Sequence, residues 1–348
     1  MRVIIDVMSG DNAPLELIRG AVNAAEELSV DITIVGDQEV IREIAEKEEI
    51  SLEKLTIVHA DSVILMEDKP LCVVREKKDS SMSVGLRMLA EGEGDAFVSA
   101  GNTGALLAGS TLVVRRIKGV QRAAIATVLP FPTPILLMDS GANLVVTPEN
   151  MEQFAYMGSI YMSKIYGLEA PRVGQLNNGT EYNKGLPLQV DTYERLTGRE
   201  DLNFIGNVES REIPFGACDV LITDGFTGNI TLKLTEGMAK FMSSTLKSLF
   251  TSNIVTKVSG LAMMNKIKEL KKQFDASEHG GAPLLGIAKP VIKAHGSSDA
   301  KAIKSAVQQA ISFVNTGINQ EIAKFSLEFE AKVKAEKTAA QEVQPQEN

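Results

Sequence analysis

The chain has 348 residues, of which 44% are hydrophobic, and a formal net charge of −9. This length suits one large or two ordinary globular domains with a sizeable core, and the acidic balance argues against a general nucleic-acid-binding protein. The two cysteines, Cys72 and Cys218, lack any metal-binding spacing, and only three histidines are present. We therefore expect buried thiols in a reducing cytoplasm and no histidine-rich metal site. We also predict that the protein uses no metal or other cofactor.

The N-terminus is strand-like instead of a basic leader, and no uncharged apolar run approaches the ~20 residues that span a bilayer. Export and membrane spanning are therefore not expected.

Apolar strands alternate with helices along most of the chain. We predict strands over residues 2–8, 32–36, 55–59, 96–98, 124–129, 135–139, 172–176, 202–208, 218–223 and 290–294, and helices from residue 14, through residue 47, from residue 106, over 148–166 and over 299–329. Strands that are apolar almost throughout are typical of a parallel sheet covered on both faces. The sequence thus predicts an α/β protein with three layers, α/β/α, around a mostly parallel sheet.

No low-complexity linker divides the chain. We predict one continuous catalytic domain of two lobes over residues 1–330, with a lysine-rich amphipathic helical segment at about 237–272. Residues 278–286 are predicted to form a glycine-rich turn. The charged, glutamine-rich residues 331–348 are predicted to be a disordered tail.

The stretch 99–109 follows an apolar strand and opens a helix. Gly101 and Gly104 allow close backbone approach, while Asn102 and Thr103 offer side-chain hydrogen bonds. A helix N-terminus with free backbone N–H groups favours an anion, such as phosphate or a developing oxyanion. The alternative is a glycine turn that only joins a strand to a helix.

A similar stretch occurs at residues 223–228. It shares the frame x-x-Gly-x-Thr-Gly with residues 99–104, and contains Gly225, Thr227 and Gly228. Two similar turns strengthen the prediction of anion binding. Neither a dinucleotide motif after the first strand nor a Walker phosphate loop is present.

Several polar residues follow predicted strands. In a parallel sheet the carboxyl ends of the strands share one edge, so these residues are expected to converge on one cleft there. They are Asn102, Asp139, Asn143, Asn177, Lys184, Asp224 and Asn229.

Residues 237–268 contain five lysines and no acidic residue. Ile254, Val258, Leu261 and Ala262 form an apolar face between these lysines. Such a helix suits an anionic membrane surface or an acidic protein partner, and equally a dimer interface or a core helix.

Several motifs in one order resemble the PlsX family of bacterial phosphate acyltransferases. They are Asp79-Ser-Ser-Met82, Ser99-Ala-Gly-Asn-Thr-Gly104, Leu137-Met-Asp-Ser-Gly-Ala-Asn143, Lys184-Gly185, Asp224-Gly-Phe-Thr-Gly-Asn229 and Lys293-Ala-His-Gly296. The resemblance spans residues 1 to about 328. His279 departs from it, because family members tend to have tyrosine there, so His279 is a poor candidate for an essential acid or base.

The resemblance implies a fold related to phosphotransacetylases and isocitrate dehydrogenase-like enzymes, with the active-site cleft at the carboxyl ends of the strands. It also implies a homodimer that associates peripherally with the inner face of the cell membrane. The implied reaction converts a fatty acyl carrier protein thioester and inorganic phosphate into acyl phosphate and free carrier protein, for phospholipid synthesis.

Such a reaction requires a cation and hydrogen-bond donors around phosphate and the thioester carbonyl more than a protein nucleophile. We predict that Lys184 neutralises phosphate, that Asn229 orients the acyl group, and that His295 or Asp224 manages a proton. The predicted phosphate- and substrate-binding residues are Ser80, Ser81, Gly101, Asn102, Thr103, Gly104, Asp139, Asn143, Asn177, Gly225, Thr227 and Gly228. Lys184 can instead be a surface charge, and Asp139 and Asp224 can be turn or helix caps.

Three alternatives stay open. A covalent acyl-cysteine route would use Cys72 or Cys218, although neither has an adjacent histidine. A decarboxylating dehydrogenase of the related fold would bind magnesium through Asp139 and Asp224. A non-catalytic docking protein would tether acyl carrier protein to the membrane through its lysine-rich segment.

Overall fold

The computed structural model describes residues 1–253, 256–257, 259, 263–264, 266 and 280–342, with the side chains of its last helix described up to residue 331. The strands are β1 (Arg2–Asp6), β2 (Asp31–Gly36), β3 (Leu55–His59), β4 (Ala96–Ser99), β5 (Ala124–Leu129), β6 (Ile135–Met138), β7 (Val173–Asn177), β8 (Phe204–Glu209), β9 (Val220–Ile222), β10 (Ala282–Leu285) and β11 (Val291–Lys293). The helices are α1 (Leu15–Glu27), α2 (Gln38–Lys47), α3 (Ser81–Glu91), α4 (Thr103–Gly109), α5 (Pro148–Tyr166), α6 (Pro187–Thr197), α7 (Gly225–Thr251), α10 (Ala300–Asn315) and α11 (Ile318–Glu342), with shorter helical segments η1 (Pro70–Val74), η2 (Ser110–Val114) and η3 (Ser210–Phe215).

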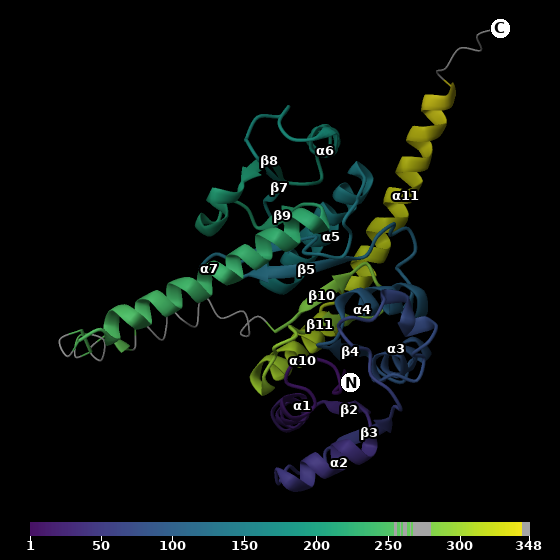
Figure 1. Ribbon diagram of the computed structural model, residues 1–348. Helices are drawn as coiled ribbons and strands as arrows, with labels where there is room; N and C mark the ends of the chain where they lie inside the picture. Colours follow the sequence, from purple (N-terminus) through teal and green to yellow (C-terminus); the bar gives the residue numbers. More distant parts are fainter. Residues whose placement is uncertain (254–255, 258, 260–262, 265, 267–279, 343–348) are drawn as a thin grey trace.

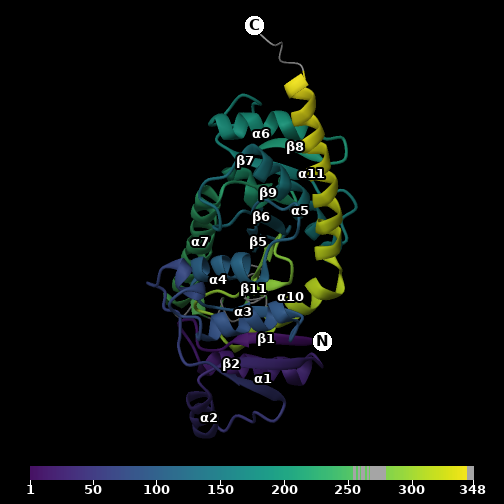
Figure 2. The ribbon, with the colours of Figure 1, turned by 90° about the vertical axis from the view of Figure 1, so that its right-hand side faces the viewer.

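These strands form one sheet in the order β3-β2-β1-β4-β11-β10-β5-β6-β9-β7-β8, with helices on both of its faces (Figures 1 and 2). The predicted three-layer α/β architecture with a mostly parallel sheet is confirmed.

The middle of the sheet breaks the parallel order. β10 is antiparallel to both β11 and β5, and β5 is antiparallel to β6. Three antiparallel contacts therefore separate the parallel strands β1, β4 and β11 from the parallel strands β6, β9 and β7, and the two sets run in opposite directions. Hence the carboxyl ends of the whole sheet do not share one edge, contrary to the argument from sequence. An apolar run reveals how deeply a strand is buried, but not its direction.

In the N-terminal half, alternate residues of β1 face two different helical layers. Val3 and Ile5 pack in a cluster with residues of α1 and α10, including Leu17 and Ile303. Ile4 points to the other face and packs in a cluster with residues of α3 and α4. This alternation is the period of two expected of a strand that is buried on both faces.

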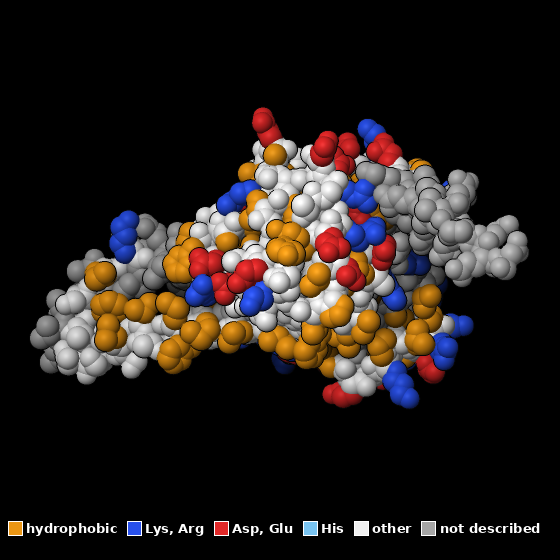
Figure 3. Space-filling model, turned by 90° about the horizontal axis from the view of Figure 1, so that it is seen from above, with side chains coloured by type: hydrophobic (Ala, Val, Ile, Leu, Met, Phe, Trp, Pro, Cys, Tyr) orange, Lys and Arg blue, Asp and Glu red, His pale blue; other side chains and the backbone are white. Residues whose placement is uncertain are grey.

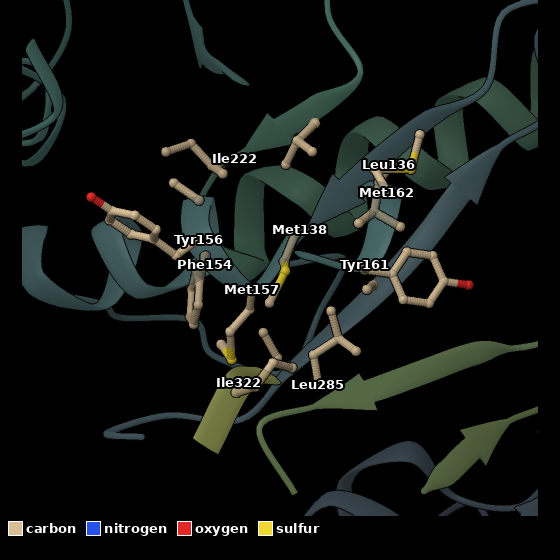
Figure 4. Close-up of a cluster of buried hydrophobic side chains, with 14 of the residues drawn as sticks. Leu136, Met138, Phe154, Tyr156, Met157, Tyr161, Met162, Ile222, Leu285 and Ile322 are labelled. Atoms are coloured by element: carbon tan, nitrogen blue, oxygen red, sulfur yellow. The ribbon is translucent and has the colours of Figure 1, made fainter. Parts of the chain in front are cut away.

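In the C-terminal half, one buried cluster joins the sheet to α5 and α11. Met138 of β6, Ile222 of β9, Phe154 and Met157 of α5 and Ile322 of α11 belong to it, and each is fully buried (Figure 4). Burial of each such side chain stabilises the fold by roughly 1.5–3 kcal/mol. The cluster holds the end of β6 rigidly, immediately before the turn at Asp139.

Three elements differ from the sequence predictions. The stretch predicted as a glycine-rich turn at 278–286 contains strand β10. The helix predicted over 299–329 is two helices, because Gly317 adopts a left-handed φ of 68° between α10 and α11. α11 then continues to Glu342, where a disordered tail was predicted from residue 331; residues 343–348 lie outside the described residues.

None of the described helices combines the length and the apolar character that crossing a membrane requires.

Candidate active site

Asn102 caps α4 and anchors a neighbouring loop. Its side-chain oxygen accepts a hydrogen bond from the Ala105 N–H at 3.0 Å. Its amide nitrogen lies within hydrogen-bond distance of the carbonyl oxygens of Leu65, Met66 and Asp68, at 3.0–3.2 Å. The side chain is thus occupied by internal hydrogen bonds, which favours a role in shaping the site.

The two glycines of this turn permit close packing. A Cβ on Gly101 would stand 2.7 Å from the Ser9 Cβ, and one on Gly104 would stand 2.9 Å from Pro70 of η1. Thr103, between them, is half-buried.

Buried side chains at the ends of β1 and β4 also form hydrogen bonds that hold this turn. The Ser99 hydroxyl donates to Asp6 at 2.8 Å and accepts a hydrogen bond from the Gly101 N–H at 3.1 Å. Asp6 is fully buried at the end of β1. The Ser9 hydroxyl, also buried, has no partner among the described residues.

Lys293, the last residue of β11, lies beside these side chains and was not predicted as a site residue. Its ammonium group donates to the carbonyl oxygen of Ala100 at 3.1 Å, and also to that of Ala294. Burial lowers the pKa of Lys293 to about 8, although the charges of Asp6 and Asp11 act in the opposite direction. A lysine at the end of an otherwise apolar strand was the available signal.

We call Asp6, Ser9, Ser99, Gly101, Asn102 and Lys293 the N-terminal cluster.

His295 lies in the turn that follows β11. Its ring is exposed, and its Nδ1 lies 2.8 Å from the Ser297 hydroxyl and accepts a hydrogen bond from the Ser297 N–H. The adjacent Gly296 carbonyl accepts a hydrogen bond from the Asp11 N–H, so the His295 turn borders the N-terminal cluster.

Ser80 and Ser81 lie at the start of α3 and are fully buried. The Ser80 hydroxyl caps this helix by accepting from the Ser83 N–H. These contacts place both serines within the protein interior, which favours a structural role over the predicted contact with substrate.

Asp139 organises the turn after β6. One carboxylate oxygen accepts hydrogen bonds from the N–H groups of Ile125, Gly141 and Ala142, and the other accepts from the backbone and side chain of Asn143, all at 2.7–3.2 Å. Burial raises the pKa of Asp139, while the hydrogen bonds from Ala142 and Asn143 oppose this shift.

The lone pairs of this carboxylate are therefore directed at N–H donors. Phosphate would meet a like charge there, and magnesium would have to displace the donors. This arrangement favours a turn-forming role for Asp139.

The start of α7 packs on that turn. The Gly225 N–H donates to the Asn143 carbonyl at 2.8 Å, and a Cβ on Gly228 would stand 1.9 Å from the Asp139 carbonyl oxygen. Asp224 caps the helix: one of its oxygens accepts from the Thr227 N–H and the other from the Thr227 hydroxyl. The glycines thus serve close packing, and Asp224 serves as a helix cap.

The repeated frame x-x-Gly-x-Thr-Gly does not produce the same local structure twice. In the first copy the cap is Asn102 and the helix begins at Thr103, whereas in the second the cap is Asp224 and the helix begins at Gly225. The second helix therefore begins two positions earlier in the frame. The sequence similarity reflects two glycine-containing helix caps, and does not support two equivalent anion sites.

Asn229 lies on the first turns of α7 and reaches back to the β6 turn. Its amide donates to the Ser140 carbonyl at 3.2 Å, and its side chain lies against Gly141. Asp139, Asn143, Asp224, Gly228 and Asn229 form what we call the central cluster.

Asn177 and Lys184 form a third group at the end of β7. The Asn177 amide donates to the Lys184 carbonyl at 3.0 Å, which closes the loop between them. Lys184 is exposed, and in the described part of the chain its ammonium makes no internal hydrogen bond or ion pair. It is therefore a cation available to a ligand.

The structure thus brings the predicted residues together in three groups. Ala142 of the central cluster's turn packs against a hydrophobic cluster that also contains Ala105 and Leu106 of α4. Convergence of all three groups on a single cleft remains a prediction.

Both cysteines are buried, and burial raises the pKa of both thiols, that of Cys218 to about 12. Both side chains are therefore protonated near neutral pH and are poor nucleophiles. Among the described residues, no group of three His, Cys, Asp or Glu side chains is arranged to hold a metal ion.

Ile254, Val258, Leu261, Ala262 and His279 lie outside the described residues. The described part of the lysine-rich segment includes the second half of α7, and this helix extends well beyond the sheet (Figure 1). Only Gly225 and Gly228 of this helix are buried.

Comparisons with known proteins agree with this fold. A family model described as "Fatty acid synthesis protein" matches residues 1–321. A phosphate acyltransferase of Thermoanaerobacter pseudethanolicus is 47% identical over 320 residues, which cover 91% of this chain and 95% of that protein.

Among solved structures, a phosphotransacetylase from Streptococcus pyogenes superposes with a TM-score of 0.56 at 15% identity, covering 92% of this chain and 94% of that one. Isocitrate dehydrogenase from Methylococcus capsulatus superposes with a TM-score of 0.50 at 10% identity, covering 93% and 87%. These two likenesses confirm the predicted fold relationship. The family match and the relative's identity show more: the chain belongs to the fatty acid synthesis protein family, to which phosphate acyltransferases belong, and is an acyltransferase.

Proposed function

We propose that the enzyme transfers a fatty acyl group from an acyl carrier protein thioester to inorganic phosphate, for the synthesis of phosphatidic acid. A phosphate oxygen forms a bond to the carbonyl carbon, the carbon–sulfur bond breaks, and the released thiolate takes up a proton. The products are acyl phosphate and free carrier protein. The family description and the name of the relative support this pair of substrates.

One observation supports direct attack by phosphate over an acyl-cysteine intermediate: both cysteines are buried. An acyl-cysteine intermediate requires a thiolate that the thioester can reach, but the pKa of the Cys72 and Cys218 thiols is raised. Phosphate is itself a nucleophile, so the protein needs to position it and to stabilise charge on the carbonyl oxygen.

We propose that Lys184 neutralises phosphate, since its ammonium is exposed and makes no internal hydrogen bond or ion pair in the described part of the chain. Thr103, the half-buried residue of the Gly101–Thr103 turn, contributes its hydroxyl as a hydrogen-bond donor at the substrate, and Asn229 orients the acyl group. His295, exposed at the end of β11, is the proposed proton-transfer group in preference to Asp224, whose oxygens both cap α7.

Purified protein mixed with palmitoyl carrier protein and phosphate tests the reaction. Acyl phosphate detected by mass spectrometry, at an unchanged rate with a chelator, supports it. No acyl phosphate would favour a docking protein instead, and activity that needs a nicotinamide cofactor would favour a dehydrogenase. A Lys184→Ala variant with normal turnover and unchanged phosphate affinity would remove Lys184 from the mechanism.

We further propose that the enzyme is a homodimer and that α7 forms its interface. Apolar side chains recur along the helix, and each is about half exposed or more: Phe226, Ile230, Leu234, Met238, Phe241, Met242 and Leu249. Hydrophobic side chains gather along this projecting helix (Figure 3). At 1.5 Å per residue the helix is about 40 Å long, enough for an extended contact with a second copy.

We also propose that the protein is cytoplasmic and that the end of its lysine-rich segment binds peripherally to the anionic inner face of the cell membrane. Exposed Lys240 and Lys247 supply positive charge on α7. Leu261→Glu, outside the described residues, should release the enzyme from anionic liposomes without changing its oligomeric state. Unchanged liposome binding with a broken dimer would place this segment in the interface.

A further inference from the structure

Lys293 is a charged residue in the middle of the sheet that the proposed chemistry does not use. It ends β11, where it is in register with Ser99 of β4. Both neighbouring strands carry residues of the hydrophobic clusters, so an ammonium group here requires compensation by nearby polar groups.

Besides the carbonyl oxygen of the next residue, Ala294, the Lys293 ammonium contacts one peptide unit, the bond between Ala100 and Gly101. The Lys293 ammonium donates to the Ala100 carbonyl oxygen at one end of that unit. The Gly101 N–H at the other end donates to the Ser99 hydroxyl, which itself donates to the buried Asp6. Both polar atoms of the same peptide plane are therefore fixed by side chains.

Orientation of that plane sets the direction of the chain that follows. Asn102 comes directly after Gly101, caps α4 and anchors the loop at residues 65–68. A rotation of the Ala100–Gly101 peptide would displace the cap, the loop and Thr103 together.

We infer that Lys293 is a positioning residue, which holds the Gly101–Thr103 turn in place by fixing the Ala100–Gly101 peptide. This inference rests on the proposed function only in so far as that turn faces the substrate. Asp6 on β1 and Asp11 in the next turn are the acidic groups near Lys293, and their charges favour its protonated form.

The test compares Lys293→Met with a matched control, Lys289→Met. Lys289 precedes β11 and also donates to a backbone carbonyl, that of Leu89, at 2.6 Å. Lys293→Met loses hydrogen bonds to two carbonyl oxygens and Lys289→Met loses one, but only Lys293 contacts the turn before α4.

Amide hydrogen exchange, measured on a peptide that contains Gly101 and Asn102, reports how firmly this turn is held and does not depend on an activity assay. Lys293→Met should raise exchange there at least several-fold, and Lys289→Met should leave it at the wild-type rate. Equal exchange in all three proteins would overturn the inference, even if the enzyme makes acyl phosphate.

Activity supplies the second readout. Lys293→Met should lower kcat on the order of 10²-fold, the effect of a small misplacement of groups at a reacting centre. Lys293→Arg, which keeps the charge, should recover part of kcat and shift the decline of activity above about pH 8 to higher pH. A wild-type pH profile in Lys293→Arg, with kcat as low as in Lys293→Met, would reduce Lys293 to a packing role. Failure of the wild-type enzyme to make acyl phosphate would refute the proposed function, while the exchange result would still decide the inference.

Discussion

Gly228 of α7 lies so close to Asp139 that a Cβ on this glycine would stand 1.9 Å from the Asp139 carbonyl oxygen. This contact seats the first turn of α7 on the turn after β6, and the hydrogen bonds from Gly225 to Asn143 and from Asn229 to Ser140 join the same two segments.

Gly228→Ala should therefore push α7 away from the Asp139 turn. Forcing an extra carbon into a packed contact destabilises a fold by roughly 1–3 kcal/mol, and we expect a loss in this range or above it, together with loss of activity. Gly237→Ala is the control on the same helix, because a Cβ there meets nothing within 4 Å. It should stabilise α7 by up to about 1 kcal/mol through helix propensity. Chemical denaturation checks both, and equal stabilities would contradict the proposed contact.

Substitutions of Asn102 should separate its two contacts. Asn102→Ala loses the cap of α4, which costs about 1 kcal/mol, and also loses the hydrogen bonds to the 65–68 loop. Asn102→Asp keeps the cap but turns a carboxylate oxygen toward three carbonyl oxygens.

Limited proteolysis at residues 61–70 should therefore be faster in Asn102→Asp than in Asn102→Ala, although the aspartate variant retains the cap. Slower cleavage in Asn102→Asp would show that the loop does not depend on the amide.

The doubly substituted variant Cys72→Ser, Cys218→Ser should keep most of the wild-type turnover. Neither thiol is exposed, and the pKa of Cys218 is raised to about 12. A buried hydroxyl left without a partner can destabilise the fold by about 1–3 kcal/mol, so turnover is measured well below the melting temperature. Loss of turnover in a folded variant, together with loss of a covalent acyl-enzyme detected by mass spectrometry, would revive the acyl-cysteine route.

Lys293 should make stability depend on pH in the alkaline range. Burial lowers the pKa of Lys293 from its ordinary 10.5 to about 8 in the folded state. Between these values the unfolded chain binds more protons than the folded protein, so the free energy of unfolding rises with pH.

Lys293→Met should lack this rise. The difference in unfolding free energy between wild type and variant, measured by urea denaturation at pH values from 7 to 10.5, isolates Lys293 from other groups that titrate in this range. A difference that stays constant with pH would contradict the shifted pKa.

The sequence was sufficient to predict the class of fold, because buried strands such as β1 and β4 have consecutive apolar residues, Val3–Ile5 and Ala96–Val98. The direction of each strand could not be predicted from the sequence, because it depends on pairing with strands that can be distant in the chain. β5, for example, lies between β10 and β6 and is antiparallel to both. The break between α10 and α11 was missed because Gly317 stands within an otherwise helical pattern.

The site residues were partly recognisable. Asn102, Asp139 and Asp224 were singled out because each follows a predicted strand, and the structure shows each of them bound to its own turn or helix. For Asp139 and Asp224 this cap role was the alternative offered by the sequence, whereas for Asn102 it was not foreseen. Lys293 was not predicted as a site residue although it opens the motif Lys293-Ala-His-Gly296, because only the fold brings the Ala100 carbonyl within reach of its ammonium group.

Acyl exchange without phosphate tests direct transfer most sharply. The enzyme is incubated with palmitoyl carrier protein and isotopically labelled free carrier protein, and movement of the palmitoyl group between them is followed by mass spectrometry before and after phosphate is added. Direct attack predicts no exchange without phosphate and, on its addition, one acyl phosphate for each thiol released. Exchange in the absence of phosphate would show that the enzyme itself carries the acyl group, and would contradict the proposed mechanism.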